Sequence, residues 1–511
     1  MKKNYDVLMI LEGTYPFNGG GVSTWAHMLC TKVRNAEFSL YSINADFEVK
    51  PKYDISNIKH LVQLPMWSAL EPSELLDYGR KYHKFVARKE RLEDDEVSKT
   101  FVPLFIELIK IIYSEITDVE ELDDVIFKMW RFFQKNDYKR TMKSEVVWKA
   151  FCYHVGDVMA DQQNDATLYD LTVGMRWMYR FLMPLSIDVP KADICHLTLA
   201  GFPVIPALVL KYKYGTPLLV TEHGVFIRER LIAINNSEFS FFLKKMLIRF
   251  SEAITELVYY KADKIVSVNK FNIVWEKLYG ANPGKIEIIY NGIDHNHFVP
   301  VEKPTHLQGT PTVVAAARIF ELKDILTMIR SCGVAKRSIP NVKFLVYGDN
   351  NAVPEYTAQC NALISELGLE HNFILAGFHP NPNKIFAEGD ISILTSISEG
   401  FPYTVLESMS CGIPVVATDV GGVTEALDEN CGFICKPKDH EEIGRRVVEL
   451  LLNDELRKQM GVNARRKVVD NFTIGKFITA YEDVYARVAR KDKDVVEPIF
   501  IRVDEQRQAA S

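Results

Sequence analysis

The chain has 511 residues, of which 47% are apolar and 25% charged, and its formal net charge is −6. This length predicts two to four domains, the composition is that of an ordinary folded protein, and the acidic balance argues against a general nucleic-acid-binding protein. The apolar run Val7–Leu11 is too short for a signal peptide, and no stretch approaches the ~20 apolar residues of a membrane span.

The N-terminal part predicts a strand at Tyr5–Leu11, a glycine-rich loop at Glu12–Gly21 and a helix at Val22–Lys32. A second alternating series begins at Asp193. Its expected strands are Ile194–Leu199, Leu218–Thr221, Lys264–Val268 and Ile286–Tyr290. Its expected helices are Pro203–Tyr214 and a segment from about Phe241 to Ala262. Alternating strands and helices predict a parallel sheet that is covered on both faces.

Residues 70 to 190 interrupt this pattern. Apolar side chains recur there at helical spacing, for example at Leu104, Leu108 and Ile112, while glycine is scarce and strand-like alternation is absent. We expect a helical insertion in the first domain. It could serve as a packed lid or spacer, or as a docking surface for a partner protein.

A polar, proline-containing stretch from Asn291 to Pro311 is the best candidate for a domain boundary. A second series of strands follows it, at Thr312–Ala317, Lys343–Tyr347, Phe373–Ala376, Ile391–Thr395 and Val415–Thr418. We therefore expect an α/β chain with two Rossmann-like domains at 1–295 and 296–475, whose strands end at a cleft. Residues 476–511 are expected to form a C-terminal helix that packs back towards the N-terminal domain, plus a charged tail.

Glu399 and Glu407 bracket the segment Gly400–Pro402 and the start of a predicted helix, which stops at Gly412. We expect Glu399 on the entry loop and Glu407 about two turns into the helix. Carboxylates that accept hydrogen bonds from hydroxyls, beside a helix N-terminus that favours anionic oxygen, suit a sugar joined to a phosphate. A glycosidase pair would need its carboxyls to face each other about 5 Å apart, so ligand holding is the better interpretation.

Two further groups follow predicted strands. The backbone amides of Gly19–Gly21 could approach a phosphate, although the segment could equally be a tight turn; its spacing does not match G-x-G-x-x-G. Arg318 and Lys323 could bind a diphosphate, or they could be solvated surface cations. Asp324 could cap the helix that follows.

His223 comes directly after a strand and could donate to a sugar oxygen, orient an acceptor, or be structural. Arg228 and Arg230 could contact an anionic acceptor or lie solvated. A zinc site at Cys431 and Cys435 is not expected, because no second pair matches them, and reduced thiols are the better interpretation. We likewise expect no metal–diphosphate role for Asp492-x-Asp494 in the charged tail.

Together these residues resemble the retaining glycosyltransferases of family 4, which have the GT-B fold. The resemblance covers about the first 60 residues and then 190 to about 485. It implies that Glu399 binds donor sugar hydroxyls, Glu407 the ribose, and Arg318 with Lys323 the diphosphate. Ala317 stands where the family usually has a glycine.

The same resemblance implies a donor-binding role for several other residues, namely Gly20, Gly21, Gly377, Phe378, Gly400, Phe401 and Pro402. In this family Gly377 and Phe378 match the segment that lines the base pocket, and His223 matches the active-site histidine. Catalysis would be electrostatic and independent of a metal. A front-face displacement would retain the anomeric configuration.

A finer resemblance rests on Leu11–Pro16, on Gly20–Trp25 and on Thr221–Arg230, together with the helical insertion. These segments are similar to the cytoplasmic glycosyltransferases of the Pel exopolysaccharide machinery (PelF-type). That implies transfer of a hexose or N-acetylhexosamine from a UDP-sugar donor to a growing polysaccharide acceptor, with inner-membrane export partners. Alternatives are a catalytically silent nucleotide-sugar-binding regulatory subunit, a family 4 transferase with another donor or acceptor, and a phosphorylase or sugar-phosphate epimerase.

Overall fold

The computed structural model describes residues 4–45, 49–72, 82–159 and 166–491. The chain divides into two compact units. The first contains Met1–Val266, Trp275–Glu287 and Tyr481–Ser511, and the second contains Ser267–Val274 and Ile288–Ala480. Asp492 and Asp494 lie outside the described residues. No described helix combines the length and the apolar character needed to cross a bilayer.

The first unit is built on a seven-stranded parallel sheet with the order β3-β2-β1-β4-β5-β6-β7. Its strands are β1 (Tyr5–Glu12), β2 (Ala36–Ile43), β3 (Leu61–Leu64), β4 (Ile194–Leu197), β5 (Leu218–Glu222), β6 (Lys264–Ser267) and β7 (Ile286–Ile288). β1 is buried almost throughout, as expected of a central parallel strand covered on both faces. The predicted strands recur with small shifts at their ends, whereas β2 and β3 were not expected from the sequence.

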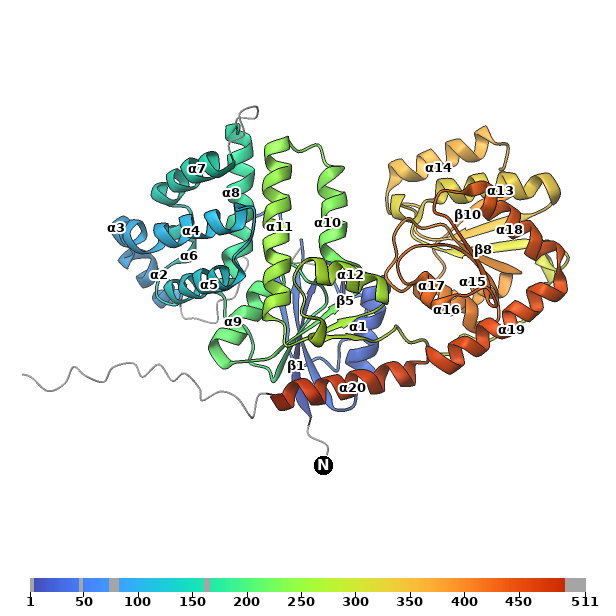
Figure 1. Ribbon diagram of the computed structural model, residues 1–511, viewed down its shortest axis with the longest axis horizontal. Helices are drawn as coiled ribbons and strands as arrows, with labels where there is room; N and C mark the ends of the chain where they lie inside the picture. The colour runs from blue at the N-terminus through green and yellow to red at the C-terminus, as the bar shows by residue number, and fades with distance from the viewer. Residues whose placement is uncertain (1–3, 46–48, 73–81, 160–165, 492–511) are drawn as a thin grey trace, which may run out of the picture. The chain divides into compact units, whose positions relative to one another are not determined.

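Helices cover this sheet, namely α1 (Gly21–Lys32), α9 (Val204–Tyr214), α10 (Phe226–Asn235) and α11 (Phe241–Lys261). Gly215 ends α9 with φ 71°, a left-handed conformation that glycine adopts without strain. Ser240 is the N-cap of α11, and its hydroxyl accepts a hydrogen bond from the Leu243 amide. Figure 1 shows α11 beside the helices that residues 82–182 contribute.

The stretch with helical spacing is helical. It contains α2 (Tyr82–Arg91), α3 (Asp94–Glu96), the π-helix η2 (Val97–Phe101), α4 (Val102–Tyr113), α5 (Val119–Phe133), α6 (Tyr138–Met142), α7 (Glu145–Met159), α8 (Leu168–Leu182) and η3 (Met183–Ser186). Their apolar side chains belong to the same core as those of the sheet. Phe181 of α8, for example, packs edge-to-face on Phe250 of α11 at 4.6 Å between ring centroids. The insertion is thus part of the first unit's core.

The second unit has a six-stranded parallel sheet with the order β10-β9-β8-β11-β12-β13. Its strands are β8 (Thr312–Ala316), β9 (Lys343–Tyr347), β10 (Phe373–Gly377), β11 (Ile391–Leu394), β12 (Val415–Thr418) and β13 (Gly432–Cys435). Its longer helices are α13 (Ile325–Ser338), α14 (Pro354–Glu366), α16 (Tyr403–Ser410), α18 (His440–Leu452) and α19 (Asp454–Asn471). Two apolar clusters contain side chains from these strands. β13 was not expected.

The last helix, α20 (Ile474–Lys491), contributes its C-terminal part to the first unit. There the Tyr485 hydroxyl lies 2.9 Å from His196 Nδ1, and the Tyr481 hydroxyl lies 3.2 Å from Thr221 Oγ1. All four side chains are buried. The end of the helix therefore completes the core of a sheet that begins almost 480 residues earlier in the chain.

Candidate active site

A polar cluster in the second unit joins two neighbouring strand ends. β8 leads into Arg318 and a short 3₁₀ turn that carries Lys323, and β11 leads into Glu399. Lys323 Nζ lies 2.5 Å from Glu399 Oε1, and the Ser396 hydroxyl donates to the same oxygen at 2.5 Å. Only 22% of the lysine and 10% of the glutamate side chain are exposed, so the ion pair is well shielded from water.

Further hydrogen bonds hold these two loops together. The Thr395 hydroxyl donates to the carbonyls of Lys323 and Asp324, at 3.0 Å in both cases. Asp324 has φ 44° and its side chain accepts from the Thr327 amide at the start of α13, so the predicted cap is present. The positions of Lys323 and Glu399 are therefore set by backbone contacts as well as by their charges.

The segment Gly400–Pro402 lies against residues from distant parts of the second unit. The Gly400 carbonyl accepts from Asn269 Nδ2 at 2.9 Å and from the Gly422 amide at 2.8 Å. Phe401 is buried, and its carbonyl accepts from Asn291 Nδ2 at 2.8 Å. Pro402 is the N-cap of α16. These contacts fix the entry loop on which Glu399 lies.

Gly421 allows this packing. Its φ is 55°, and a Cβ added there would lie 1.8 Å from the Glu399 carbonyl oxygen. Only glycine lets the two backbone segments approach so closely. The double glycine after β12 thus shapes the Glu399 loop.

Glu407 is the fifth residue of α16, little more than one turn into the helix rather than the expected two. Its side chain is half-buried, and burial raises the pKa of the carboxyl from 4.5 to about 7. A carboxyl with this pKa changes its charge near neutral pH. It can accept hydrogen bonds from hydroxyls on both oxygens only when it is ionised.

Arg318, Gly377 and Phe378 lie at the ends of β8 and β10. The Arg318 side chain is exposed, with its guanidinium carbon 5.0 Å from the centre of the Phe320 ring. The Gly377 carbonyl accepts from the Gly348 amide at 3.0 Å, while Phe378 is 76% exposed. The Arg318 guanidinium and the Phe378 ring therefore both lie outside the hydrophobic core.

The other predicted residues belong to the first unit. Gly20 and Gly21 are exposed, and Gly20 has φ 137° and precedes α1, which begins one residue before the expected start. His223 is only 9% exposed, and its ring packs edge-to-face on Trp25 at 4.5 Å between centroids. Burial lowers the pKa of His223 to about 3, so the ring is neutral at physiological pH.

The structure therefore brings Lys323 and Glu399 into direct contact and places Gly400–Pro402 beside them. Ser396, Asn269 and Gly421 were not singled out as site residues from the sequence, although they complete this cluster. The available signals were the polar residues directly after β6 and β11 and the double glycine after β12. Each signal is weak until the sheet order is known.

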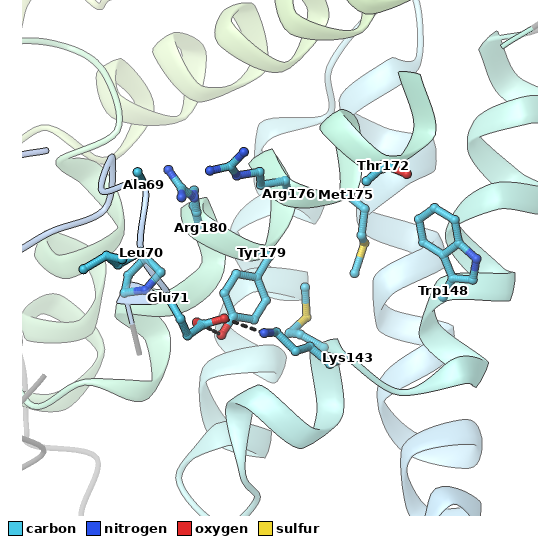
Figure 2. A pocket seen from close by; sticks show the side chains of 12 residues that line it. Ala69, Leu70, Glu71, Lys143, Trp148, Thr172, Met175, Arg176, Tyr179 and Arg180 are labelled. Atoms are coloured by element: carbon cyan, nitrogen blue, oxygen red, sulfur yellow. Dashed lines mark hydrogen bonds and ion pairs between the residues drawn. The ribbon is translucent and has the colours of Figure 1, made fainter. Parts of the chain in front are cut away.

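A hollow of about 610 Å³ lies in the helical insertion and contains none of the predicted residues. It is lined by the loop Ala69–Pro72 and by side chains of the insertion helices, as Figure 2 shows. There Glu71 pairs with Lys143 and accepts from the Tyr179 hydroxyl at 2.7 Å. Arg176 of α8 also lines the hollow.

Two protein families match the chain. The family described as "Domain of unknown function (DUF3492)" matches residues 5–284, which is more than half of the chain. The family described as "Glycosyl transferases group 1" matches residues 301–467. The second match contains Arg318, Lys323, Gly377, Phe378, the segment Glu399–Pro402 and Glu407, but not Gly20 or Gly21.

Two curated relatives illustrate the similarity. The chain is 32% identical over 155 residues to N-acetyl-alpha-D-glucosaminyl L-malate synthase of Bacillus anthracis, which covers 30% of this chain and 40% of that protein. It is 26% identical over 217 residues to UDP-Gal:alpha-D-GlcNAc-diphosphoundecaprenol alpha-1,3-galactosyltransferase of Escherichia coli. That match covers 40% of this chain and 54% of the relative. In both cases the chain spans less than two thirds of the relative's length.

Among solved structures, Anabaena HepE in complex with UDP superimposes with a TM-score of 0.59 at 14% identity, over 94% of this chain and 100% of HepE. Sucrose-phosphate synthase of Thermosynechococcus elongatus gives a TM-score of 0.59 at 13% identity, over 95% and 99%. At such low identity the likeness shows the fold alone. With its two parallel sheets, the chain has the GT-B fold.

Proposed function

Because the chain belongs to the family with the DUF3492 domain and is a group 1 glycosyltransferase, we propose that it transfers a hexose or N-acetylhexosamine from a UDP-sugar. The acceptor is a growing exopolysaccharide of the Pel type in the cytoplasm, and the anomeric configuration is retained. Inner-membrane export proteins are the proposed partners. The proposed domains are 1–295 for the acceptor, 296–475 for the donor and 476–511 for the C-terminal helix and tail.

The observation that carries this proposal is the contact between Lys323 and Glu399. A lysine ammonium is a point charge for phosphate, and a carboxylate accepts hydrogen bonds from sugar hydroxyls. Their separation of 2.5 Å supports the proposal that both functions act at one point. A ligand that joins a phosphate directly to a sugar matches this arrangement, which is the chemistry of a nucleotide-sugar.

In the proposed reaction the bond between the anomeric carbon and the β-phosphate oxygen breaks. An acceptor hydroxyl forms the new bond to the same face of that carbon, and its proton goes to the departing phosphate. Arg318 and Lys323 stabilise the negative charge that grows on UDP, which is the largest contribution expected in such a site. Glu399 holds the sugar hydroxyls, and Glu407 holds the ribose.

The remaining predicted residues have supporting roles in this proposal. Gly377 and Phe378 line the uracil side of the donor site, and the exposed ring of Phe378 is available for stacking. Gly20 is the N-cap of α1 and Gly21 is its first residue, and the N-terminus of a helix favours phosphate oxygen. His223 acts as a neutral hydrogen-bonding group towards the sugar or the acceptor. A metal ion is not required by this set of charges.

The comparisons support a UDP donor. The Escherichia coli relative carries UDP-Gal in its name, and HepE was solved with UDP and with UDP-glucose. The test is calorimetric titration of the full chain with UDP, ADP and GDP in EDTA, followed by UDP-sugars. We expect selective binding of UDP at micromolar concentrations.

Release of UDP in the presence of a polysaccharide acceptor then separates an enzyme from a silent nucleotide-sugar-binding subunit. We expect UDP release that depends on the acceptor. Tight UDP binding without any release would favour the silent subunit, and preference for ADP or GDP would overturn the donor assignment.

A further inference from the structure

A cluster of aromatic rings lies at the carboxyl ends of strands in the first unit. Trp67 follows β3, Phe202 follows β4, and Trp177 comes from α8. The Trp67 ring lies 5.0 Å from the Trp177 ring and 5.4 Å from the Phe202 ring, between centroids. Both tryptophans are only partly buried. Because Trp177 belongs to the helical insertion, the insertion supplies one wall of this cluster.

Glu12, the last residue of β1, joins the cluster. Its Oε1 accepts from the Trp67 indole nitrogen at 2.9 Å. Its Oε2 is buried and has no hydrogen-bond partner among the described residues. Burial raises the pKa of the Glu12 carboxyl to about 7, against the opposing effects of the Trp67 hydrogen bond and the Arg230 charge. A buried carboxyl oxygen without a partner is costly unless a ligand or water satisfies it.

Arg230 of α10 lies on the same rings. Its guanidinium carbon is 5.4 Å from the centre of the Trp177 ring and 5.5 Å from that of Phe202. Within the part of the chain that the structure describes, its buried Nε has no hydrogen-bond partner. Glu12 and Arg230 influence each other's pKa through their charges, yet no ion pair joins them. Each therefore keeps an unused polar atom.

We propose that Glu12 and Arg230, framed by Trp67 and Trp177, hold a sugar ring of the acceptor chain. A hydroxyl both donates and accepts, so the hydroxyls of one sugar ring can donate to Glu12 and accept from Arg230. When Glu12 is ionised, a fully deprotonated phosphate could not donate to it, and an ammonium could not accept from a guanidinium. Indole faces provide the apolar surface that the CH face of a pyranose needs. This inference rests on the proposed function, whose acceptor it places.

The cluster is held in place by contacts that do not involve the unused atoms. Arg180 of α8 donates to the carbonyl of Ser68, the residue after Trp67. The Ser240 hydroxyl donates to Asp170 Oδ1 at 2.7 Å and so ties α8 to the start of α11. Trp67 and Trp177 therefore approach each other from two anchored segments, as a preformed site requires.

The test uses the full chain with maltotetraose, cellotetraose and N-acetylchitotetraose as probes, each followed by tryptophan fluorescence. We expect the wild type to bind at least one probe at millimolar concentrations. Glu12→Gln turns the free acceptor atom into a donor, and should weaken binding by about tenfold to a hundredfold, as for loss of a hydrogen bond to a charged group. Arg230→Lys and Trp177→Leu should each weaken it by roughly tenfold.

Trp148→Leu is the matched control, because Trp148 is a partly buried tryptophan of the same insertion that lines the hollow of Figure 2 instead of the cluster. It should bind the probe as the wild type does. UDP affinity, measured on every variant by calorimetry, should stay within about twofold of the wild type. That readout also shows that Glu12→Gln and Trp177→Leu leave the donor half folded.

The outcomes separate the two proposals. Failure of the wild type to bind any of the three tetrasaccharides, or equal binding by all the variants, would overturn the acceptor subsite. The wild type could bind a saccharide, lose that affinity in Glu12→Gln and Trp177→Leu, and show no binding of UDP. That result would support the subsite and overturn the donor proposal. An equal loss of probe binding in Trp148→Leu would also count against the subsite, because it would show a general effect on the insertion.

Discussion

Lys323 Nζ and Glu399 Oε1 lie 2.5 Å apart in the second unit, although 76 residues separate them in the chain. They meet because β8 and β11 are neighbours in the sheet and both strands end at the same edge. The two opposite charges form a direct ion pair. In the proposed donor complex the phosphate shares Lys323 with Glu399, which would couple phosphate binding to sugar recognition.

Lys323→Ala should reduce turnover by about a hundredfold or more, because the site loses one charge that stabilises the departing phosphate. Lys323→Ala and Glu399→Gln should also be non-additive in UDP-sugar affinity, since the two residues interact directly. The measurement is a double-mutant cycle on steady-state kinetics. Lys303→Ala is the control, because Lys303 pairs with Asp390 at 2.7 Å in the same unit and is similarly shielded. Additive effects of Lys323→Ala and Glu399→Gln on UDP-sugar affinity would contradict the proposed coupling between the two residues.

Arg318→Ala should lower kcat by about a hundredfold with little change in the stability of the fold, because the side chain is exposed. Arg446→Ala is a matched control, since its guanidinium carbon also lies on a phenylalanine, at 4.6 Å from the Phe433 ring. Thermal unfolding and UDP release are measured on both variants. Near-normal turnover of Arg318→Ala would remove it from the diphosphate site.

Gly421→Ala should disturb the Glu399 loop, because the added Cβ would lie 1.8 Å from the Glu399 carbonyl oxygen. We expect donor affinity to fall about tenfold or more, together with a loss of stability. Gly368→Ala is the control: Gly368 also has a positive φ, of 59°, but no atom lies within 4 Å of the added Cβ. That variant carries only backbone strain, of about 1 kcal/mol, and should bind UDP normally. Calorimetry and thermal unfolding distinguish the two.

UDP affinity should rise about tenfold between about pH 6 and pH 8, because the pKa of Glu407 is near 7 and its ionised form accepts from the ribose hydroxyls. Calorimetry at several pH values measures this change. Glu407→Gln should bind UDP more weakly at the higher pH and lose most of the pH dependence. An unchanged profile in that variant would assign the pH effect to UDP itself.

The same raised pKa predicts a stability effect of opposite sign. Between the ordinary pKa of 4.5 and about 7 the folded state holds the Glu407 proton more tightly than the unfolded state does, so this group makes the protein less stable as the pH rises through that window. Thermal unfolding at about pH 5 and pH 7.5 should show a smaller fall in Glu407→Gln than in the wild type. Equal falls would mean that Glu407 is not buried enough to contribute.

Sequence patterns located most strands to within one or two residues where each strand is a short apolar run bounded by turn residues. β2 and β3 were not expected from the sequence, and β3 is a strand of only four residues, three of them partly buried. β13 contains a glycine, a phenylalanine and a cysteine beside a single β-branched residue. A strand of this composition is identified only by its pairing with a neighbouring strand, and that pairing exists only in the folded sheet.

The order of local elements, and the pairing of Glu399 with a helix start and Glu407, could be derived from the sequence alone, because turn residues and hydrophobic periodicity act over a few positions. The tertiary structure decided which distant groups meet: Asn269 with Gly400, and Glu12 with Trp67. It also decided that His223 is buried and neutral. The reason is physical: burial and long-range hydrogen bonds depend on the order of the strands in the sheet, which no local pattern encodes.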